Sequence, residues 1–264
     1  MKKKRLDKLL LAVLSALVLW PVGASAQTVR GDFDYDGDFD ISDLTALINY
    51  LSYGEWTDQP VGLQRDTIEV KGETIVMVKV DGGILEHDDG WMFRVNDFWI
   101  CQTEVTRELW HSLMGGTYYN VNQHYAVSGV SWNDCQAFLD TLNAYTGRVF
   151  RLPTCPEWEF AARGGNLSRG YTYCGGNDID VVGWYNDNCS KVMPVALLKC
   201  NELGLYDMSG NVTEWTNDKA SSNGSTYYLC GGRYSGDAAA NLPSARGQSP
   251  VDTGFSGSGL RLAM

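Results

Sequence analysis

Glycines and helix-capping residues divide the sequence from Asp66 onward into short runs. The shortness of these runs restricts the possible folds more than any other feature of the sequence. Runs rich in β-branched residues occur at 67–70 and 74–80, and a further strand pair is expected within 91–100. Brief segments with helical spacing follow, each ending within a few turns. The pattern predicts an α+β domain that contains much irregular structure.

Three of the brief segments begin with a side chain that can cap a helix. The predicted N-caps are Thr106, Ser131 and Thr154, and glycine pairs at 115–116 and 164–165 end the first and third helices. The expected core-facing residues of the first two helices are Leu109, Trp110, Leu113 and Met114, and then Cys135, Phe138, Leu139 and Leu142. Each helix is therefore expected to be short and to bury one face.

Residues 1–26 have the three parts of an export signal. Basic residues precede an apolar run at 9–19, and small residues at 24–26 form a cleavage site. A membrane-spanning helix is the alternative, but it needs about 20 apolar residues and this run is shorter. We expect cleavage after Ala26 and no membrane insertion afterwards. The mature chain is expected to be secreted, periplasmic or on the cell surface.

Residues 27–53 contain an acidic loop with the register of an EF-hand. Side-chain oxygens stand at loop positions 1, 3, 5, 9 and 12, Gly37 stands at position 6, and a run with helical spacing follows. Ca²⁺ prefers six to eight oxygen ligands, so an ion explains this crowding of carboxylates better than a solvated acidic turn does. The predicted calcium residues are Asp32, Asp34, Asp36, Asp38, Asp40 and Asp43.

The same segment resembles one half of a dockerin module, which implies a cohesin-like partner and an assembly role as one alternative. Dockerins usually carry two such segments, and the sequence shows one. Residues 54–73 are interpreted as a linker and residues 74–264 as the main domain.

Charge and cysteine content limit the partners of the mature chain. Loss of residues 1–26 removes five basic side chains and one acidic one, which changes the formal net charge from −11 to about −15. A field of that sign repels phosphate backbones and anionic lipids, so we expect no nucleic-acid partner. The seven cysteines show no CxxC pair, and an exported chain permits disulfides whose connectivity the spacing leaves open.

Four motifs of the main domain resemble the successive signatures of the formylglycine-generating enzyme family, also called sulfatase-modifying factors. They lie at 96–106, 127–134, 151–165 and 204–215, and residues 254–263 are similar to that family's terminal strand. The resemblance covers residues 74–264 and implies a C-type-lectin-like fold of the formylglycine-generating type. Residue types alone also allow a purely structural interpretation, in which these motifs cap helices, fill a core and turn the chain.

The resemblance also bears on chemistry. The family oxidises a substrate cysteine with two cysteines of its own, which follow a double glycine and bind copper and the substrate thiol. Here the double glycine is 231–232, and Cys230, just before it, is the last cysteine of the chain. We therefore expect no copper and no catalytic residue, which favours a non-catalytic domain. A sulfatase-modifying oxidoreductase remains the disfavoured alternative.

The resemblance implies a second Ca²⁺ site, in the turn of the fourth motif. Carried over position by position, its ligands would be the side chains of Asp207 and Glu214 and the carbonyls of Gly210 and Val212. The alternative is that both carboxylates only hydrogen-bond the turn.

A binding role is the remaining interpretation of the irregular C-terminal segment. Residues 233–259 are rich in Ser, Gly and Ala with a few aromatic and Arg residues, a composition typical of recognition surfaces as well as of plain loops. In some relatives this segment is diversified by retroelements. The predicted ligand-facing residues are Arg233, Tyr234, Asp237, Asn241 and Arg246, and the expected ligand is an extracellular protein or glycan.

Overall fold

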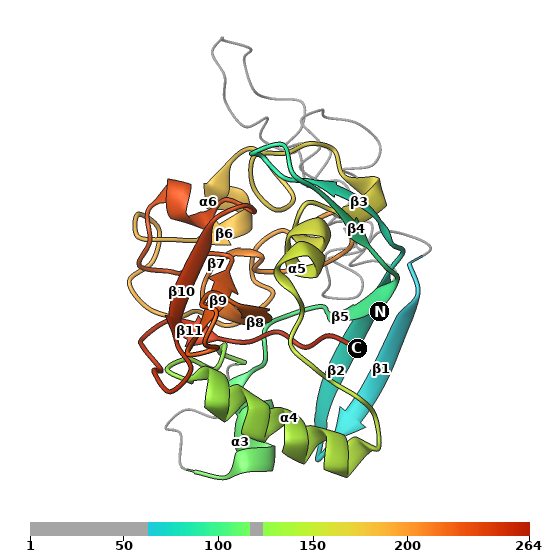
Figure 1. Ribbon diagram of the computed structural model, residues 1–264. Coiled ribbons are helices and arrows are strands. Elements are labelled where there is room, and N and C mark those ends of the chain that lie inside the picture. The colour runs from blue at the N-terminus through green and yellow to red at the C-terminus, as the bar shows by residue number, and fades with distance from the viewer. Residues whose placement is uncertain (1–62, 117–123) are drawn as a thin grey trace, which may run out of the picture. The chain divides into compact units, whose positions relative to one another are not determined.

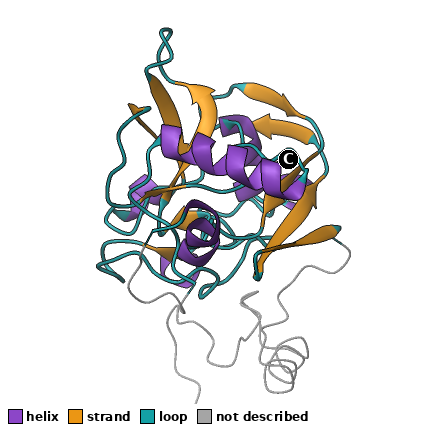
Figure 2. Ribbon diagram, turned by 90° about the horizontal axis from the view of Figure 1, so that it is seen from below, coloured by secondary structure: helices purple, strands orange, loops and turns teal. Residues whose placement is uncertain are grey.

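The computed structural model describes residues 63–116 and 124–264, and both ranges belong to the unit Asp58–Met264. The described elements are, in chain order, β1 (Arg65–Val70), β2 (Glu73–Val80), β3 (Gly83–Glu86), β4 (Met92–Val95), β5 (Phe98–Cys101), α3 (Arg107–Met114), α4 (Trp132–Thr146), α5 (Cys155–Ala162), α6 (Ile179–Val182), β6 (Gly183–Trp184), β7 (Ser209–Gly210), β8 (Thr213–Lys219), β9 (Thr226–Cys230), β10 (Arg246–Pro250) and β11 (Ser258–Gly259). Figure 1 shows their arrangement, and Figure 2 shows how much of this unit is loop, as the sequence predicts.

One antiparallel sheet has the strand order β1-β2-β5. Its first hairpin runs from the pair Arg65–Val78 to the pair Val70–Glu73, and the turn residues Lys71 and Gly72 have φ values of 51° and 91°. Two positive φ values match the twist of a tight hairpin. Strand β1 lies inside the range 54–73 that the sequence assigns to a linker, so the folded domain begins by Arg65.

The two strands expected within 91–100 both form, but they join different sheets. Strand β4 pairs with β3, whereas β5 pairs with β2. Between them, the side chain of Asp97 accepts a hydrogen bond from the backbone N–H of Gly82 at 2.9 Å. A side chain at Gly82 would collide with the backbone of residues 95–97, so glycine is required for this close approach.

All three predicted helices are confirmed, as α3, α4 and α5. Thr106 caps α3, and Ser131 and Thr154 form reciprocal capping boxes at the starts of α4 and α5. The four predicted core residues of α4 are buried. In α3 the prediction was wrong for Met114, which is 37% exposed because it is the last residue before the Gly115 cap.

A second sheet has the order β10-β9-β8-β11, with β11 parallel to β8. Beyond β11 the chain leaves this sheet and bonds to β5: Leu262 O accepts from Cys101 N at 2.8 Å, and Met264 O accepts from Trp99 N at 3.1 Å. The C-terminus accordingly lies beside β5 and β2 in Figure 1. The last residues therefore join the two sheets.

Two apolar clusters form the core. The first contains Phe138 of α4 and Trp215 of β8, and the second contains Trp158 of α5 and Ile100 of β5, all almost fully buried. Figure 2 shows α4 lying across the face that is viewed from below. Trp158 and Trp215 of the motifs therefore fill the core, as the structural interpretation predicts, whereas Trp99 and Trp132 are partly buried against the first cluster. Among the described residues, no helix has the length and apolar character needed to cross a membrane.

Candidate ligand-binding site

The first candidate site is a buried turn at residues 207–214, where the sequence predicts a calcium ion. Asp207 and Asn211 have φ values of 57° and 54°, a conformation that costs non-glycine residues free energy. Glu104 holds the turn, since its two oxygens accept from Asn211 Nδ2 at 2.7 Å and from Val212 N at 3.0 Å. Burial raises the pKa of Glu104 well above its usual range. Sequence reasoning missed Glu104 because its partner lies 107 positions away.

The structure places the four predicted calcium residues Asp207, Gly210, Val212 and Glu214 together in this turn, all buried. One oxygen of Asp207 accepts from Ala196 N at 2.7 Å, while Oδ1 is buried and has no partner among the described residues. Burial raises the pKa of Asp207 to about 6. The Oδ1 atom fits a cation ligand.

The carboxylate of Glu214 is less available. Arg261 donates to both of its oxygens at 2.8 to 3.0 Å, and Trp158 donates its indole N–H to Oε2. The described residues contain no group of three or more His, Cys, Asp or Glu side chains placed to hold a metal. A metal in this turn would therefore depend on backbone carbonyls in addition to Asp207, and the calcium site stays a prediction.

Two of the predicted recognition residues, Arg233 and Arg246, line a cavity of about 290 Å³ whose wall also includes Gly236 and Phe255; we call it the Arg233 cavity. The guanidinium of Arg233 lies 5.3 Å from the centre of the Phe255 ring, a cation–π contact, and Arg233 is exposed. Arg246 is tied to the buried carboxylate of Glu159 by a 2.8 Å ion pair. Arg233 is thus the cation that the cavity leaves available.

The other predicted recognition residues differ in their exposure. Asp237 is exposed and its Oδ1 accepts from Ala240 N at 2.9 Å, so it caps a short turn. Tyr234 is half-buried, and its hydroxyl bonds to Ser256 Oγ at 2.8 Å. Asn241 was wrongly predicted to face a ligand: it is fully buried, because its side chain packs under Gly232 and donates to Asp237 O.

No cysteine lines the Arg233 cavity. All seven cysteines lie among the described residues as free thiols, and Cys189 is the one that is half-buried rather than buried. A hydrogen bond with the Cys155 thiol, together with burial, raises the pKa of Cys230 well above its usual range. A neutral, buried thiol is a poor nucleophile and a poor metal ligand.

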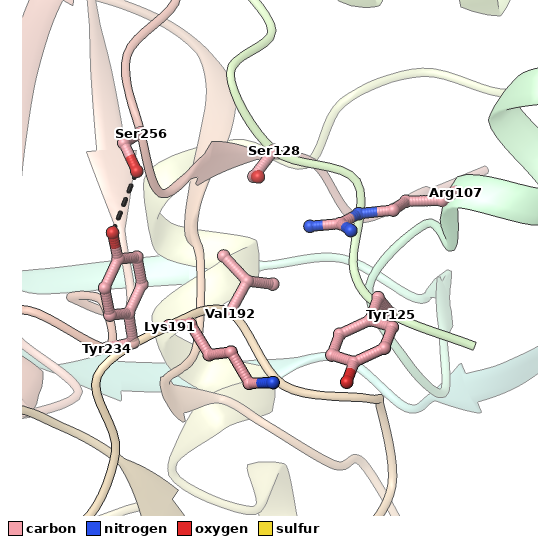
Figure 3. A pocket seen from close by; sticks show the side chains of 7 residues that line it. All are labelled: Arg107, Tyr125, Ser128, Lys191, Val192, Tyr234 and Ser256. Atoms are coloured by element: carbon pink, nitrogen blue, oxygen red, sulfur yellow. Dashed lines mark hydrogen bonds between the residues drawn. The ribbon is translucent and has the colours of Figure 1, made fainter. Parts of the chain in front are cut away.

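A second cavity, of about 300 Å³, was not predicted from the sequence except through Tyr234. Its wall is formed by Arg107, Tyr125, Ser128, Lys191, Val192, Tyr234 and Ser256, which Figure 3 shows; we call it the Arg107–Lys191 cavity. These side chains come from five separate stretches of the chain, so no motif of closely spaced residues could predict this cavity.

The acidic loop lies outside the described residues. Its predicted ligands Asp32, Asp34, Asp36, Asp38, Asp40 and Asp43 therefore stay a prediction, as do the signal peptide at 1–26 and the dockerin-like segment at 27–53.

Comparison with protein families gives one match over most of the chain. The model described as "Sulfatase-modifying factor enzyme 1-like domain" matches residues 58–264. Among solved structures, Treponema denticola variable protein 1 superimposes with a TM-score of 0.68 at 25% sequence identity, covering 78% of this chain and 99% of that one.

Two curated relatives match shorter stretches. Chaperone protein LppX of Paenibacillus barcinonensis is 31% identical over 174 residues, covering 46% of this chain and 62% of the relative. Inactive C-alpha-formylglycine-generating enzyme 2 of Bos taurus is 38% identical over 126 residues, covering 42% of this chain and 39% of the relative. The chain therefore spans less than two thirds of the length of either relative.

Proposed function

The chain belongs to the sulfatase-modifying factor enzyme 1-like family, and we propose that its domain is a non-catalytic binding module for an extracellular protein or glycan. The α+β fold of the formylglycine-generating type, which the motifs predict, is confirmed by the family match and by the solved neighbour. A fold of this kind hosts more than one function, so the function is inferred from the residues of the site.

The observation that carries the proposal is the composition of the Arg233 cavity. Oxidation of a substrate thiol in this family relies on two reactive cysteines after the double glycine, and this chain has Gly236 and other non-thiol residues there. The last cysteine, Cys230, is buried and its pKa is raised well above its usual range. Without a thiolate pair the site lacks the soft ligands that hold Cu(I), so we expect no copper.

What the cavity does offer is a recognition surface. Arg233 is exposed, and among the described residues it has no carboxylate within ion-pair distance. It stacks on Phe255, while the half-buried Tyr234, the next residue along the chain, lines the neighbouring Arg107–Lys191 cavity. Arginine and tyrosine are enriched at the energetic centres of interfaces because they combine a large contact area with directional hydrogen bonds. Arg233 and Tyr234 are therefore the proposed anchors.

The names of the relatives agree with a domain that has other uses than oxidation. One is called an inactive formylglycine-generating enzyme and another a chaperone. The solved neighbour is called a variable protein. These descriptions support a binding role in this chain without naming its ligand.

Export and calcium complete the proposal. Residues 1–26 direct the chain out of the cytoplasm, to a secreted, periplasmic or cell-surface location. The loop at 32–43 binds Ca²⁺ and orders the N-terminal segment, which attaches or supports the main domain and is a candidate for a cohesin-like partner. A second Ca²⁺ binds at Asp207 with the carbonyls of Gly210 and Val212, beside Glu214.

Two assays on the full mature chain test this function. In the first, a cysteine-containing sulfatase peptide is incubated with the protein and copper, beside an authentic formylglycine-generating enzyme, and mass spectrometry reads the conversion. We expect no mass shift with this chain. In the second, glycan and extracellular-protein arrays are probed with the wild type, and we expect at least one ligand to be retained.

Matched variants tie the retained ligand to the cavity. Arg233→Ala should abolish retention, whereas Arg94→Ala removes an exposed arginine of β4 and should leave retention unchanged. Conversion of the peptide by the wild type would contradict the proposal. So would a result in which Arg233→Ala retains every ligand as strongly as the wild type does.

A further inference from the structure

The Arg107–Lys191 cavity brings together residues that are far apart in the sequence. Arg107 begins α3, Tyr125 precedes α4, Lys191 comes from a loop after β6, and the C-terminal segment supplies Tyr234 and Ser256. In Figure 3 the guanidinium of Arg107 and the side chain of Lys191 extend into the space between the two tyrosines. A binding site built by so many segments depends on the fold as a whole.

Neither cation of the cavity has an acidic partner in the part of the chain that the structure describes. Within residues 63–116 and 124–264, neither Arg107 nor Lys191 has a carboxylate within ion-pair distance, and no carboxylate lines the cavity. Their neighbour is instead the Tyr125 ring, whose centre is 5.1 Å from the Arg107 guanidinium carbon and 5.8 Å from Lys191 Nζ. In a chain with a formal net charge of −11, two uncompensated cations in one cavity favour an anionic ligand.

The guanidinium is held in place for such a ligand. Arg107 Nε donates to Ala126 O at 3.3 Å, which leaves the two terminal nitrogens without a hydrogen-bond partner among the described residues. Two parallel N–H donors match the two oxygens of a carboxylate or sulfate group. Lys191, an exposed side chain, adds a mobile point charge on the same cavity.

The remaining wall is rich in hydroxyl groups. Tyr125, Tyr234, Ser128 and Ser256 each carry one, and Val192 is the one aliphatic side chain among the lining residues. The hydroxyls of Tyr234 and Ser256 are already bonded to each other at 2.8 Å, which fixes their positions. The volume of about 300 Å³ is at the small end of the range for ligand sites. A small polar ligand with several hydroxyls fits these properties better than an apolar one.

We propose that the Arg107–Lys191 cavity binds an acidic sugar residue, with the carboxylate or sulfate on Arg107 and Lys191 and the sugar hydroxyls on the Tyr and Ser side chains. The two cations lie in one cavity of a chain whose formal net charge of −11 repels extended polyanions, so a single acidic unit is favoured over a nucleic acid. This proposal extends the proposed binding function to a second cavity. It rests on that function in one respect, that the domain binds a ligand and does not oxidise a thiol.

The experiment titrates the full mature chain with glucuronate, glucose and sulfate at one fixed calcium and salt concentration, and follows binding by NMR. Glucuronate should bind saturably, and glucose should bind at least about 10-fold more weakly, because it lacks the group that forms charge-assisted hydrogen bonds. Lys191→Gln should weaken glucuronate binding about 10-fold, and Lys191→Arg should largely preserve it. Lys219→Gln, at an exposed lysine of β8, is the matched control and should have no effect.

The outcomes separate this inference from the proposed function. Arg107→Gln should weaken binding as Lys191→Gln does; if it alters the fold by losing the bond to Ala126, the Lys191 variants decide, since that side chain is exposed. Absence of saturable glucuronate binding, or equal affinity in Lys191→Gln, overturns the inference. Sulfate that binds as tightly as glucuronate overturns the assignment to a sugar. None of these results bears on array retention through Arg233.

Discussion

Glu214 and Arg261 form an ion pair that is completely shielded from solvent. Both side chains are 0% exposed, and Oε1 lies 2.8 Å from Nη2. Arg261 also donates to the backbone oxygens of Cys101 and Tyr206, and Trp158 donates to Glu214. The pair therefore connects α5, β5, β8 and the C-terminal segment in a single buried network.

Neutralising one member of this pair should destabilise the domain strongly. In Glu214→Gln the Arg261 cation stays buried without the carboxylate it is hydrogen-bonded to, and breaking a buried pair in this way costs about 3–5 kcal/mol. Urea unfolding at pH 7, in chelator to exclude calcium effects, measures the free energy of unfolding. Glu69→Gln on the exposed face of β1 is the control, with an expected change within about 0.5 kcal/mol. A loss no larger than the control's would show that the network does not need the charge.

The carboxylate of Glu157 gives stability that depends on pH. Burial opposes its ionisation, but the hydrogen bonds from Arg151 and from the backbone N–H of Thr154 prevail and hold the pKa of Glu157 below its ordinary value of 4.5. A lowered folded-state pKa stabilises the folded state above about pH 4.5, and this contribution is lost as the pH falls through the folded-state value. Glu157→Gln should therefore reduce stability at pH 7 and have little effect near pH 3.

Urea unfolding of wild type and Glu157→Gln at pH 7, 5, 4 and 3 measures that difference. Asp140→Asn, at an exposed position of α4, is the matched control and should follow the wild type throughout. A difference between wild type and Glu157→Gln that stays constant from pH 7 to 3 would contradict the assigned role of the ionised carboxylate.

Features that depend on neighbours in the sequence could be predicted, and features that depend on distant partners could not. The cap of α4 needs only Ser131 and Asp134, three positions apart, and its prediction is confirmed. Strands β4 and β5 pair with different strands, and the chain between them is held by a hydrogen bond from Gly82 to Asp97, a contact that hydrophobic periodicity does not reveal. The pattern therefore identified the strands but not their sheets.

The same distinction applies to the candidate sites. Arg233 was predicted from residue type and is exposed, but the burial of Asn241 follows from its packing under Gly232. Arg246 forms an ion pair with Glu159, which lies 87 positions away in the sequence. The composition of the C-terminal segment therefore could not predict that this arginine already has a partner. Arg107 directly follows the motif at 96–106 and begins α3, and nothing in this local context shows that its side chain forms part of a cavity wall.

Calcium should stabilise the main domain through Asp207, independently of the acidic loop. Its buried Oδ1 lacks a partner among the described residues, so a bound cation would relieve the cost of burying it. Calcium at about 100 times its dissociation constant contributes about 2.7 kcal/mol, or roughly 5–10 °C in the melting temperature of a domain this size. In thermal scans with calcium and with chelator, Asp207→Ala should lose this shift.

The double variant Asp32→Ala, Asp36→Ala is the matched control for that experiment. It should keep the shift of the main transition and lose only the calcium bound by the N-terminal loop, which titration calorimetry counts. A wild-type melting temperature that is the same in calcium and in chelator would refute the second site and leave the loop untouched.

Cysteine reactivity should separate a structural thiol from a catalytic one. Cys189 is half-buried while the other cysteines are buried, and Cys230 is further protected because its hydrogen bond with Cys155 and its burial raise its pKa. Brief maleimide treatment of the reduced native chain at pH 7 should therefore label Cys189 alone, at a slow rate because burial raises the pKa of that thiol too. Cys189→Ser should remove the label, and denatured protein should take up seven. Labelling of Cys230 in the native chain, located by peptide mass spectrometry, would mean that a reactive thiol is accessible from the Arg233 cavity. That result would favour thiol oxidation over a purely binding role.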